Sequence, residues 1–155
     1  MSGFKNFIPK KLIQARKNYI HYKVKRCVKT LLDNSKDKEI EAVFDFIEKN
    51  PLHWFPYEWT KKYNPENISV HFDEAAQMHF VYHGAHKLYY PKNLSKQQVA
   101  DGYNGILLEQ DIDSPHRYEA EGFNVSQGDV ISELGAAEAS WALENIEKAK
   151  NSVYI

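Results

Sequence analysis

The stretch that decides the fold is GDVISELGAAEASWALENIEKAKNSVYI, residues 128–155. Its segment 130–134 is a short apolar run typical of a buried strand, and the small residues 135–137 follow it. Apolar residues then recur at helical spacing, namely Ala139, Ala142, Leu143, Ile146 and Ala149. The polar pair 151–152 ends this helix, and residues 153–155 begin a second strand. The order predicts a βαβ unit with two parallel strands.

Small residues and one acid in this stretch predict a ligand site. Small residues at the end of a strand let a ligand approach the backbone, and the start of the next helix presents unpaired N–H groups. Glu133 stands at the end of the strand, where its carboxylate can accept a hydrogen bond from an ammonium or hydroxyl group. Further along the helix, Glu144 and Lys148 have the i,i+4 spacing of an exposed ion pair.

Upstream of this stretch the sequence predicts a small α+β arrangement. Apolar and polar residues alternate in segments 68–72, 78–83 and 86–90, which predicts a three-stranded antiparallel meander. Ser95 and Gln98 then form a capping-box signature for a helix. A further helix is expected before the meander from four apolar residues at helical spacing: Ile40, Val43, Phe44 and Ile47.

Three histidines of the meander, His79, His83 and His86, raise the question of a metal site. On a strand that rises about 3.3 Å per residue, His79 and His83 share a face but lie ~13 Å apart, which is too far to share one ion. His86 lies across a turn, and no nearby cysteine completes a ligand set. We therefore expect a solvated polar face of the sheet and no metal.

The connector 51–67 contains five aromatic residues between three prolines. Aromatic clusters can stack on sugar rings, but aromatic residues between prolines more often fix a linker to a neighbouring core, and we favour packing.

The charge of the chain is divided unevenly. Residues 1–32 contain nine basic and no acidic residues, whereas the 11 basic and 21 acidic residues of 33–155 give a net charge of -10. Six apolar residues at helical spacing predict a basic helix with a core-facing side: Ile13, Ile20, Val24, Cys27, Val28 and Leu31. The basic side chains of residues 5–29 can contact a membrane surface or phosphates, or can lie against the acidic part of the same chain, which we favour.

Length and composition limit the class of protein. The 155 residues amount to about one domain, and the longest apolar run is shorter than the ~20 residues of a membrane span. The single cysteine, Cys27, excludes an internal disulfide, and the N-terminus lacks the apolar core of a secretory signal. We therefore expect a soluble cytoplasmic protein.

The segment 128–143 resembles motif I of the class I, Rossmann-like S-adenosylmethionine-dependent methyltransferases, and its sequence is GDVISELGAAEASWAL. It resembles in particular the FkbM type, whose loop accommodates an Ala-Glu pair. The segment YNGILLEQDIDSPHRYEAEGF, residues 103–123, is similar to the one that precedes this strand in bacterial members, and the likeness extends back to about Asn50. The resemblance implies transfer of a methyl group from S-adenosylmethionine to an oxygen of a small molecule or sugar.

Carried over residue by residue, the resemblance makes Glu133 the acid beside the methionine moiety and Gly135 the residue of closest backbone approach. Three residues line the loop: Ala136, Ala137 and Glu138. Ala139 stands where the family pattern has a second glycine. Restoring that glycine inside the predicted helix is expected to cost up to ~1 kcal/mol of stability. The resemblance identifies no catalytic residue and no metal.

The resemblance also implies a division of the chain. We expect a basic helical segment 1–50, an accessory α+β region 51–127, and the start of a truncated Rossmann-like domain at 128–155. In the family, the acid that binds the ribose lies at the end of the second strand, and further strands complete the sheet. Residues 1–155 alone are therefore expected to be inactive, unless a second copy completes the sheet. The alternative is a non-catalytic module that binds a partner or membrane, but no nucleic acid, through its basic helix.

Overall fold

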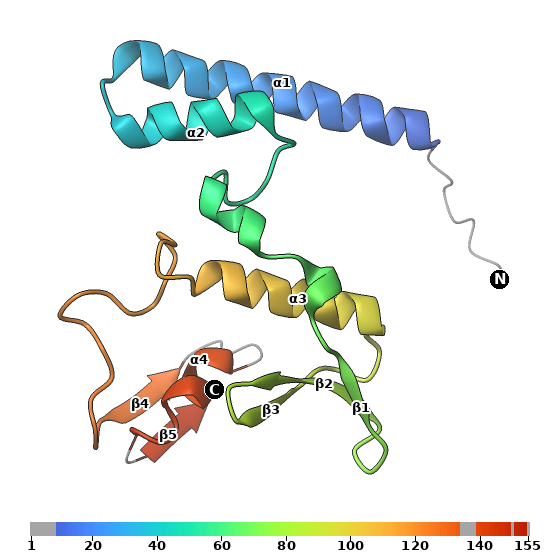
Figure 1. Cartoon of the computed structure of the whole chain (residues 1–155), viewed down its shortest axis with the longest axis vertical. Helices are drawn as coiled ribbons and strands as arrows, with labels where there is room; N and C mark the ends of the chain where they lie inside the picture. Colours follow the sequence, from blue (N-terminus) through green and yellow to red (C-terminus); the bar gives the residue numbers. More distant parts are fainter. Residues whose placement is uncertain (1–8, 134–138, 150, 155) are drawn as a thin grey trace. The chain divides into compact units, whose positions relative to one another are not determined.

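The structure is a computed structural model that describes residues 9–133, 139–149 and 151–154. The chain has an α+β fold that divides into two compact units, residues 1–61 and 62–155. Figure 1 shows the elements of each unit.

The N-terminal unit contains a hairpin of two helices, α1 (Lys10–Asn34) and α2 (Lys38–Lys49). Asp37 begins α2, because its side chain accepts a hydrogen bond from the backbone N–H of Glu39 at 2.8 Å. The hairpin is held by the His21 ring, whose Nε2 lies 2.7 Å from the Ile47 carbonyl oxygen, and by the apolar side chains that α2 buries, Phe46 and Ile47. Both predicted helices are confirmed.

The predicted core-facing side of α1 is largely wrong. Val24 and Val28 are half-buried, but Ile13, Ile20 and Leu31 are exposed, and no described residue of α1 is buried. For Ile13 and Ile20 the reason is the different length of the two helices. At 1.5 Å per residue the 25 residues of α1 span about 38 Å, whereas the 12 residues of α2 span about 18 Å and cover only the C-terminal half of α1.

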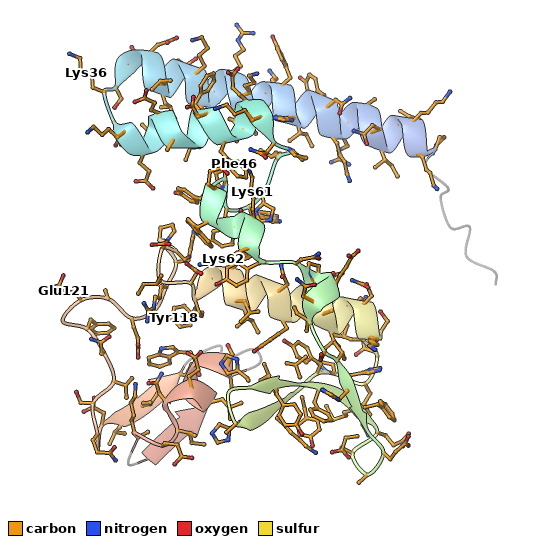
Figure 2. All side chains as sticks on the ribbon, in the orientation of Figure 1. Lys36, Phe46, Lys61, Lys62, Tyr118 and Glu121 are labelled. Atoms are coloured by element: carbon orange, nitrogen blue, oxygen red, sulfur yellow. The ribbon has the colours of Figure 1, made fainter. Side chains whose placement is uncertain are left out.

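Aromatic residues of the connector pack against one another and against α2, as expected. Tyr57 stacks on Trp59 with 6.0 Å between the ring centroids, and its hydroxyl donates a hydrogen bond to Glu39 at 2.8 Å. The Lys61 ammonium lies 5.5 Å from the centroid of the Phe46 ring (Figure 2). Trp54 is the exception, because its side chain is 95% exposed.

The C-terminal unit begins with the predicted antiparallel meander, formed by β1 (His71–Asp73), β2 (Met78–His83) and β3 (His86–Tyr89). The helix α3 (Lys96–Glu109) begins with the predicted capping box of Ser95 and Gln98. The meander and α3 share the main apolar core, which consists of Val70, Val81, Leu88, Tyr90, Val99 and Ala100. Both elements therefore form as the periodicity and the cap predict.

The second sheet has the predicted strand, helix, strand order. The strands β4 (Val130–Glu133) and β5 (Asn151–Tyr154) pair in parallel, with Glu133 opposite Tyr154. The helix between them, α4 (Ser140–Asn145), is shorter than predicted. Leu143 of α4 packs against the main core, and Ala142 is fully buried. This contact attaches the parallel strands to the meander.

Ala139 lies outside the regular part of α4. It precedes the first helical residue and has left-handed backbone angles, φ 55° and ψ 31°. Such angles cost a residue with a Cβ about 1–2 kcal/mol, and glycine adopts them without that cost. The premise of the expected stability cost, a position inside the helix, is therefore wrong, and we expect glycine at position 139 to stabilise the fold.

We expect Ala139→Gly to raise the free energy of unfolding by about 1 kcal/mol, because glycine relieves the left-handed angle. Urea denaturation followed by circular dichroism measures the change. The control is Ala142→Gly in the buried helix interior, which should lower the free energy by at least ~1 kcal/mol. Equal effects of the two substitutions would contradict the backbone explanation.

Candidate functional site

The candidate site begins at Glu133, the last residue of β4. Its carboxylate accepts a hydrogen bond from the backbone N–H of Ala142 in α4. Its other oxygen, Oε2, is buried and has no hydrogen-bond partner among the described residues. Burial raises the pKa of the Glu133 carboxyl, and the hydrogen bond from Ala142 opposes that rise. The end of β4 therefore holds a buried oxygen that is available to a donor from a ligand.

A pocket of about 330 Å³ lies beside the same strand and helix. It is lined by Val130, Ile131 and Ser132 of β4, by Trp141 of α4, and by loop residues that include Glu119 and Phe123. Two buried polar atoms of this lining, Glu119 Oε1 and Trp141 Nε1, have no hydrogen-bond partner in the part of the chain described. One of these atoms accepts and the other donates, so the pocket suits a group that does both, such as a hydroxyl or an amide.

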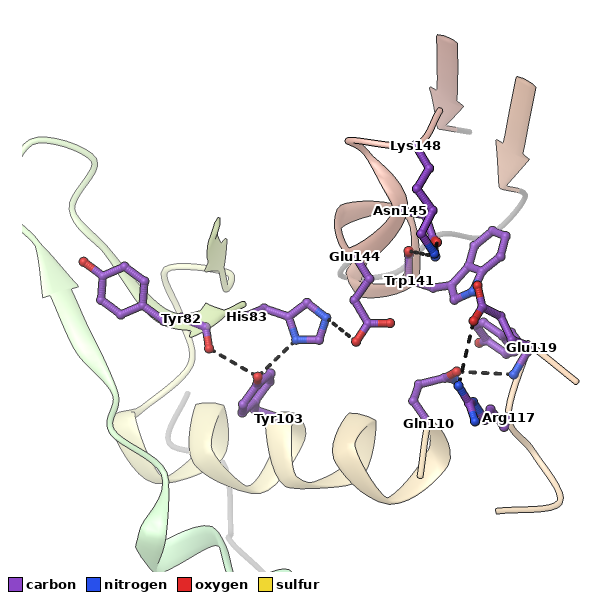
Figure 3. A network of polar contacts seen from close by, with 11 residues as sticks. Tyr82, His83, Tyr103, Gln110, Arg117, Glu119, Trp141, Glu144, Asn145 and Lys148 are labelled. Atoms are coloured by element: carbon purple, nitrogen blue, oxygen red, sulfur yellow. Dashed lines mark hydrogen bonds and ion pairs between the residues drawn. The ribbon is translucent and has the colours of Figure 1, made fainter. Parts of the chain in front are cut away.

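Three contacts fix the loop that supplies Glu119. The Tyr118 ring meets the Trp141 ring edge-on at 6.0 Å between centroids, and the Tyr118 backbone N–H donates to Gln110 at 3.3 Å. Arg117 lies 3.8 Å from the second carboxylate oxygen of Glu119. Figure 3 shows this group next to α4. The loop between α3 and β4 thereby becomes one wall of the pocket.

A polar network joins β2, α3 and α4 (Figure 3). The Tyr103 hydroxyl donates to the Tyr82 carbonyl oxygen at 3.2 Å and lies 3.0 Å from His83 Nδ1. His83 Nε2 lies 3.2 Å from a carboxylate oxygen of Glu144. The ring of His83 therefore lies between the Tyr103 hydroxyl and the Glu144 carboxylate. The hydrogen bond from His83 lowers the pKa of the Glu144 carboxyl, against the opposing effect of burial.

This network corrects two expectations. His83 is 5% exposed and does not lie on a solvated face, because α3 and α4 cover that end of the meander. Glu144 contacts His83, while Lys148 donates to Asn145 at 3.0 Å, so the predicted Glu144–Lys148 pair is wrong. Among the described residues, no group of three or more His, Cys, Asp or Glu side chains is placed to hold a metal ion.

Of the residues predicted to bind the cofactor, Glu133 lies as expected at the end of β4. The others, Gly135, Ala136, Ala137 and Glu138, lie outside the described residues. Sequence reasoning missed Glu119 and Trp141. The loop around Glu119 has no periodicity that predicts its position beside β4.

Comparison with known proteins adds no relative, because no family model, no curated protein and no solved structure matches the chain. In the part of the chain that is described, none of the helices combines the length and the apolar character needed to cross a membrane.

The contact between Glu144 and His83 predicts a pH-dependent contribution to stability. The pKa of Glu144 is lower in the folded chain than its ordinary value of 4.5, so this contribution is present above that value and is lost as pH falls below it. We expect Glu144→Gln to lower the free energy of unfolding at pH 7 by about 0.5 kcal/mol, a small amount because the carboxylate is half-exposed and screened. Urea denaturation at pH 7 and at pH ~3.5 measures the change.

Glu147 provides the matched control. Its carboxylate is 85% exposed and lies 3.8 Å from His86. Glu147→Gln should therefore change stability by less than about 0.2 kcal/mol at either pH. A loss as large as that of Glu144→Gln would show that net charge, and not the His83 contact, sets the effect.

A second pair of variants tests the two roles of the Glu133 carboxyl. A raised pKa means that ionisation at neutral pH costs stability, and this cost disappears as pH falls below the ordinary value of 4.5. Glu133→Gln keeps an oxygen for the Ala142 N–H without the charge, so we expect a free energy of unfolding at pH 7 equal to or above that of the wild type. Glu133→Ala loses the acceptor and should cost ~1 kcal/mol. Urea denaturation of both variants measures their free energies of unfolding. A Glu133→Gln variant clearly less stable than the wild type would contradict the conclusion that burial makes the ionised carboxylate costly.

Proposed function

We propose that residues 128–155 form part of the cofactor site of an S-adenosylmethionine-dependent methyltransferase. The observation that carries the proposal is the buried oxygen of Glu133, which has no partner among the described residues and lies at the carboxyl end of a parallel strand. In sheets of parallel strands joined by helices, ligands bind at the carboxyl ends of the strands. The position of Glu133 agrees with the one that the resemblance assigns to the methionine-binding acid.

The chemistry of the cofactor fits this oxygen. The methionine moiety of S-adenosylmethionine carries an ammonium group, a charged donor that matches a carboxylate acceptor. When bound, the cofactor supplies a methyl group that an oxygen nucleophile of a small molecule or sugar can accept. Gly135 is assigned by the resemblance to the closest approach of the backbone.

The neighbouring pocket extends the proposed site along β4. Glu119 and Trp141 line it with one acceptor and one donor, and Phe123 adds an apolar surface. A hydroxyl-bearing acceptor molecule satisfies both polar atoms, which is consistent with methyl transfer to oxygen. In this proposal the loop 114–123 contributes to the acceptor side and Glu133 to the cofactor side.

Calorimetric titration of the protein with S-adenosylmethionine tests the proposal. We expect binding that Glu133→Gln weakens about ten-fold, because a hydrogen bond between two charged groups is lost. Gly135→Val should abolish binding, since a branched side chain occupies the space of closest approach.

Two controls make the outcome decisive. Glu147→Gln removes an exposed carboxylate of the same region and should bind the cofactor like the wild type. Circular dichroism must show that Gly135→Val stays folded. A folded Gly135→Val variant with unchanged affinity, or a wild-type protein without affinity, would overturn the proposal. Micromolar binding by residues 1–155 together with a dimeric state would mean that a second copy completes the sheet.

A further inference from the structure

The N-terminal half of α1 is a helix surface that its own unit leaves uncovered. Every residue from Pro9 to Ile20 is exposed, because α2 covers only the C-terminal half of α1. Figure 2 shows side chains projecting above and below this half of the helix, beyond the end of α2. Its helical stability therefore does not come from burial within the hairpin.

The charges of α1 are mostly unpaired. Of its eight basic residues, Lys25 pairs with Glu48 at 2.6 Å and Lys29 with Asp33 at 3.5 Å. The other six form no ion pair within the described residues: Lys10, Lys11, Arg16, Lys17, Lys23 and Arg26. The first acid of the chain is Asp33, so the helix carries a nearly continuous positive potential.

The face of α1 opposite α2 combines these cations with apolar side chains. At about 100° per residue, His21, Val24 and Val28 share the face toward α2. The opposite face carries what we call the outer row: Leu12, Arg16, Tyr19, Tyr22, Lys23 and Arg26. Its three apolar members are well exposed, Leu12 by 61%, Tyr19 by 60% and Tyr22 by 58%. The Lys23 ammonium lies 5.8 Å from the centroid of the Tyr19 ring, within the same row.

We propose that the outer row binds the surface of an anionic lipid bilayer, with α1 lying flat in the interface. A helix of this kind gains from apolar side chains that enter the headgroup boundary and from cations that approach the anionic headgroups. Tyrosine suits that depth because its ring is apolar and its hydroxyl stays wet. A nucleic acid uses the same cations, but it gives Leu12 no apolar medium to enter, so the mixed composition of the row favours lipid.

The proposal does not depend on the methyltransferase assignment, since it concerns only α1. The test is sedimentation of the full chain with vesicles of phosphatidylcholine that contain about 30% phosphatidylserine, compared with pure phosphatidylcholine. We expect binding to the anionic vesicles only, and weaker binding at high salt. Each cation near the surface contributes roughly five-fold, so Arg16→Gln, Lys23→Gln and Arg26→Gln together should lower the partition coefficient about 100-fold.

Two further variants separate the row from net charge. Lys36→Gln, Lys92→Gln and Lys96→Gln remove the same charge at exposed positions outside the row and should change binding less than about three-fold. Leu12→Ser, Tyr19→Ser and Tyr22→Ser keep every charge and should weaken binding at least ~10-fold. All the replaced side chains are exposed, so the melting temperature should not change.

The results that overturn the proposal are equally specific. If the wild-type chain does not sediment with the anionic vesicles, the proposal of membrane binding is wrong. Equal losses from the two cation triples would reduce it to a net-charge effect. Tighter binding to a single-stranded or duplex oligonucleotide than to the vesicles, lost in the Arg16, Lys23 and Arg26 triple, would make the partner a nucleic acid.

Discussion

The packing of α4 against the meander, through Leu143 and the contact of Glu144 with His83, is the constraint on which the C-terminal unit depends. Two parallel strands such as β4 and β5 cannot cover both of their faces, and a sheet of this size is marginal alone. The helix α4 overcomes this limit because Leu143 enters the core of the meander while Glu144 reaches the buried ring of His83. The apolar contact of Leu143 buries surface area, and the polar contact of Glu144 fixes the direction from which α4 approaches the meander.

The position of α4 in turn shapes the candidate site. The backbone N–H of Ala142 donates a hydrogen bond to one carboxylate oxygen of Glu133. Trp141, one residue earlier, lines the pocket beside β4. A buried polar atom without a partner costs free energy, and native folds keep few of them. Glu133, Glu119 and Trp141 each contribute one such atom, counted over the described residues, and all three belong to or border the same strand. Glu119 and Trp141 line the pocket beside β4, whereas Glu133 ends that strand and is not one of the lining residues.

Local patterns in the sequence predicted the elements, and long-range contacts decided what the sequence could not predict. The Ser95 cap and the alternation of the meander depend on neighbours within a few residues, so they were readable. His83 is buried by contacts with α3 and α4, which lie 20 or more residues further along the chain. The alternation of apolar and polar residues in the strand does not reveal these contacts, so it wrongly predicted a solvated His83. Glu144 and Lys148 had the right spacing for a pair, but spacing does not reveal a closer partner on another element. At Ala139 helix propensity was a poor guide, because the residue precedes the helix and has a left-handed backbone angle that favours glycine.

The uncovered face of α1 follows from the same reasoning about unpartnered groups. A helical hairpin can tolerate one long helix, but exposed leucine and tyrosine side chains gain nothing from water, and six cations without ion pairs in the described residues repel one another. The chain keeps both features on one side of one helix, where neither stabilises the hairpin. An anionic surface with an apolar interior satisfies both at once, since the cations stay at the headgroups and the side chains of Leu12, Tyr19 and Tyr22 leave the water.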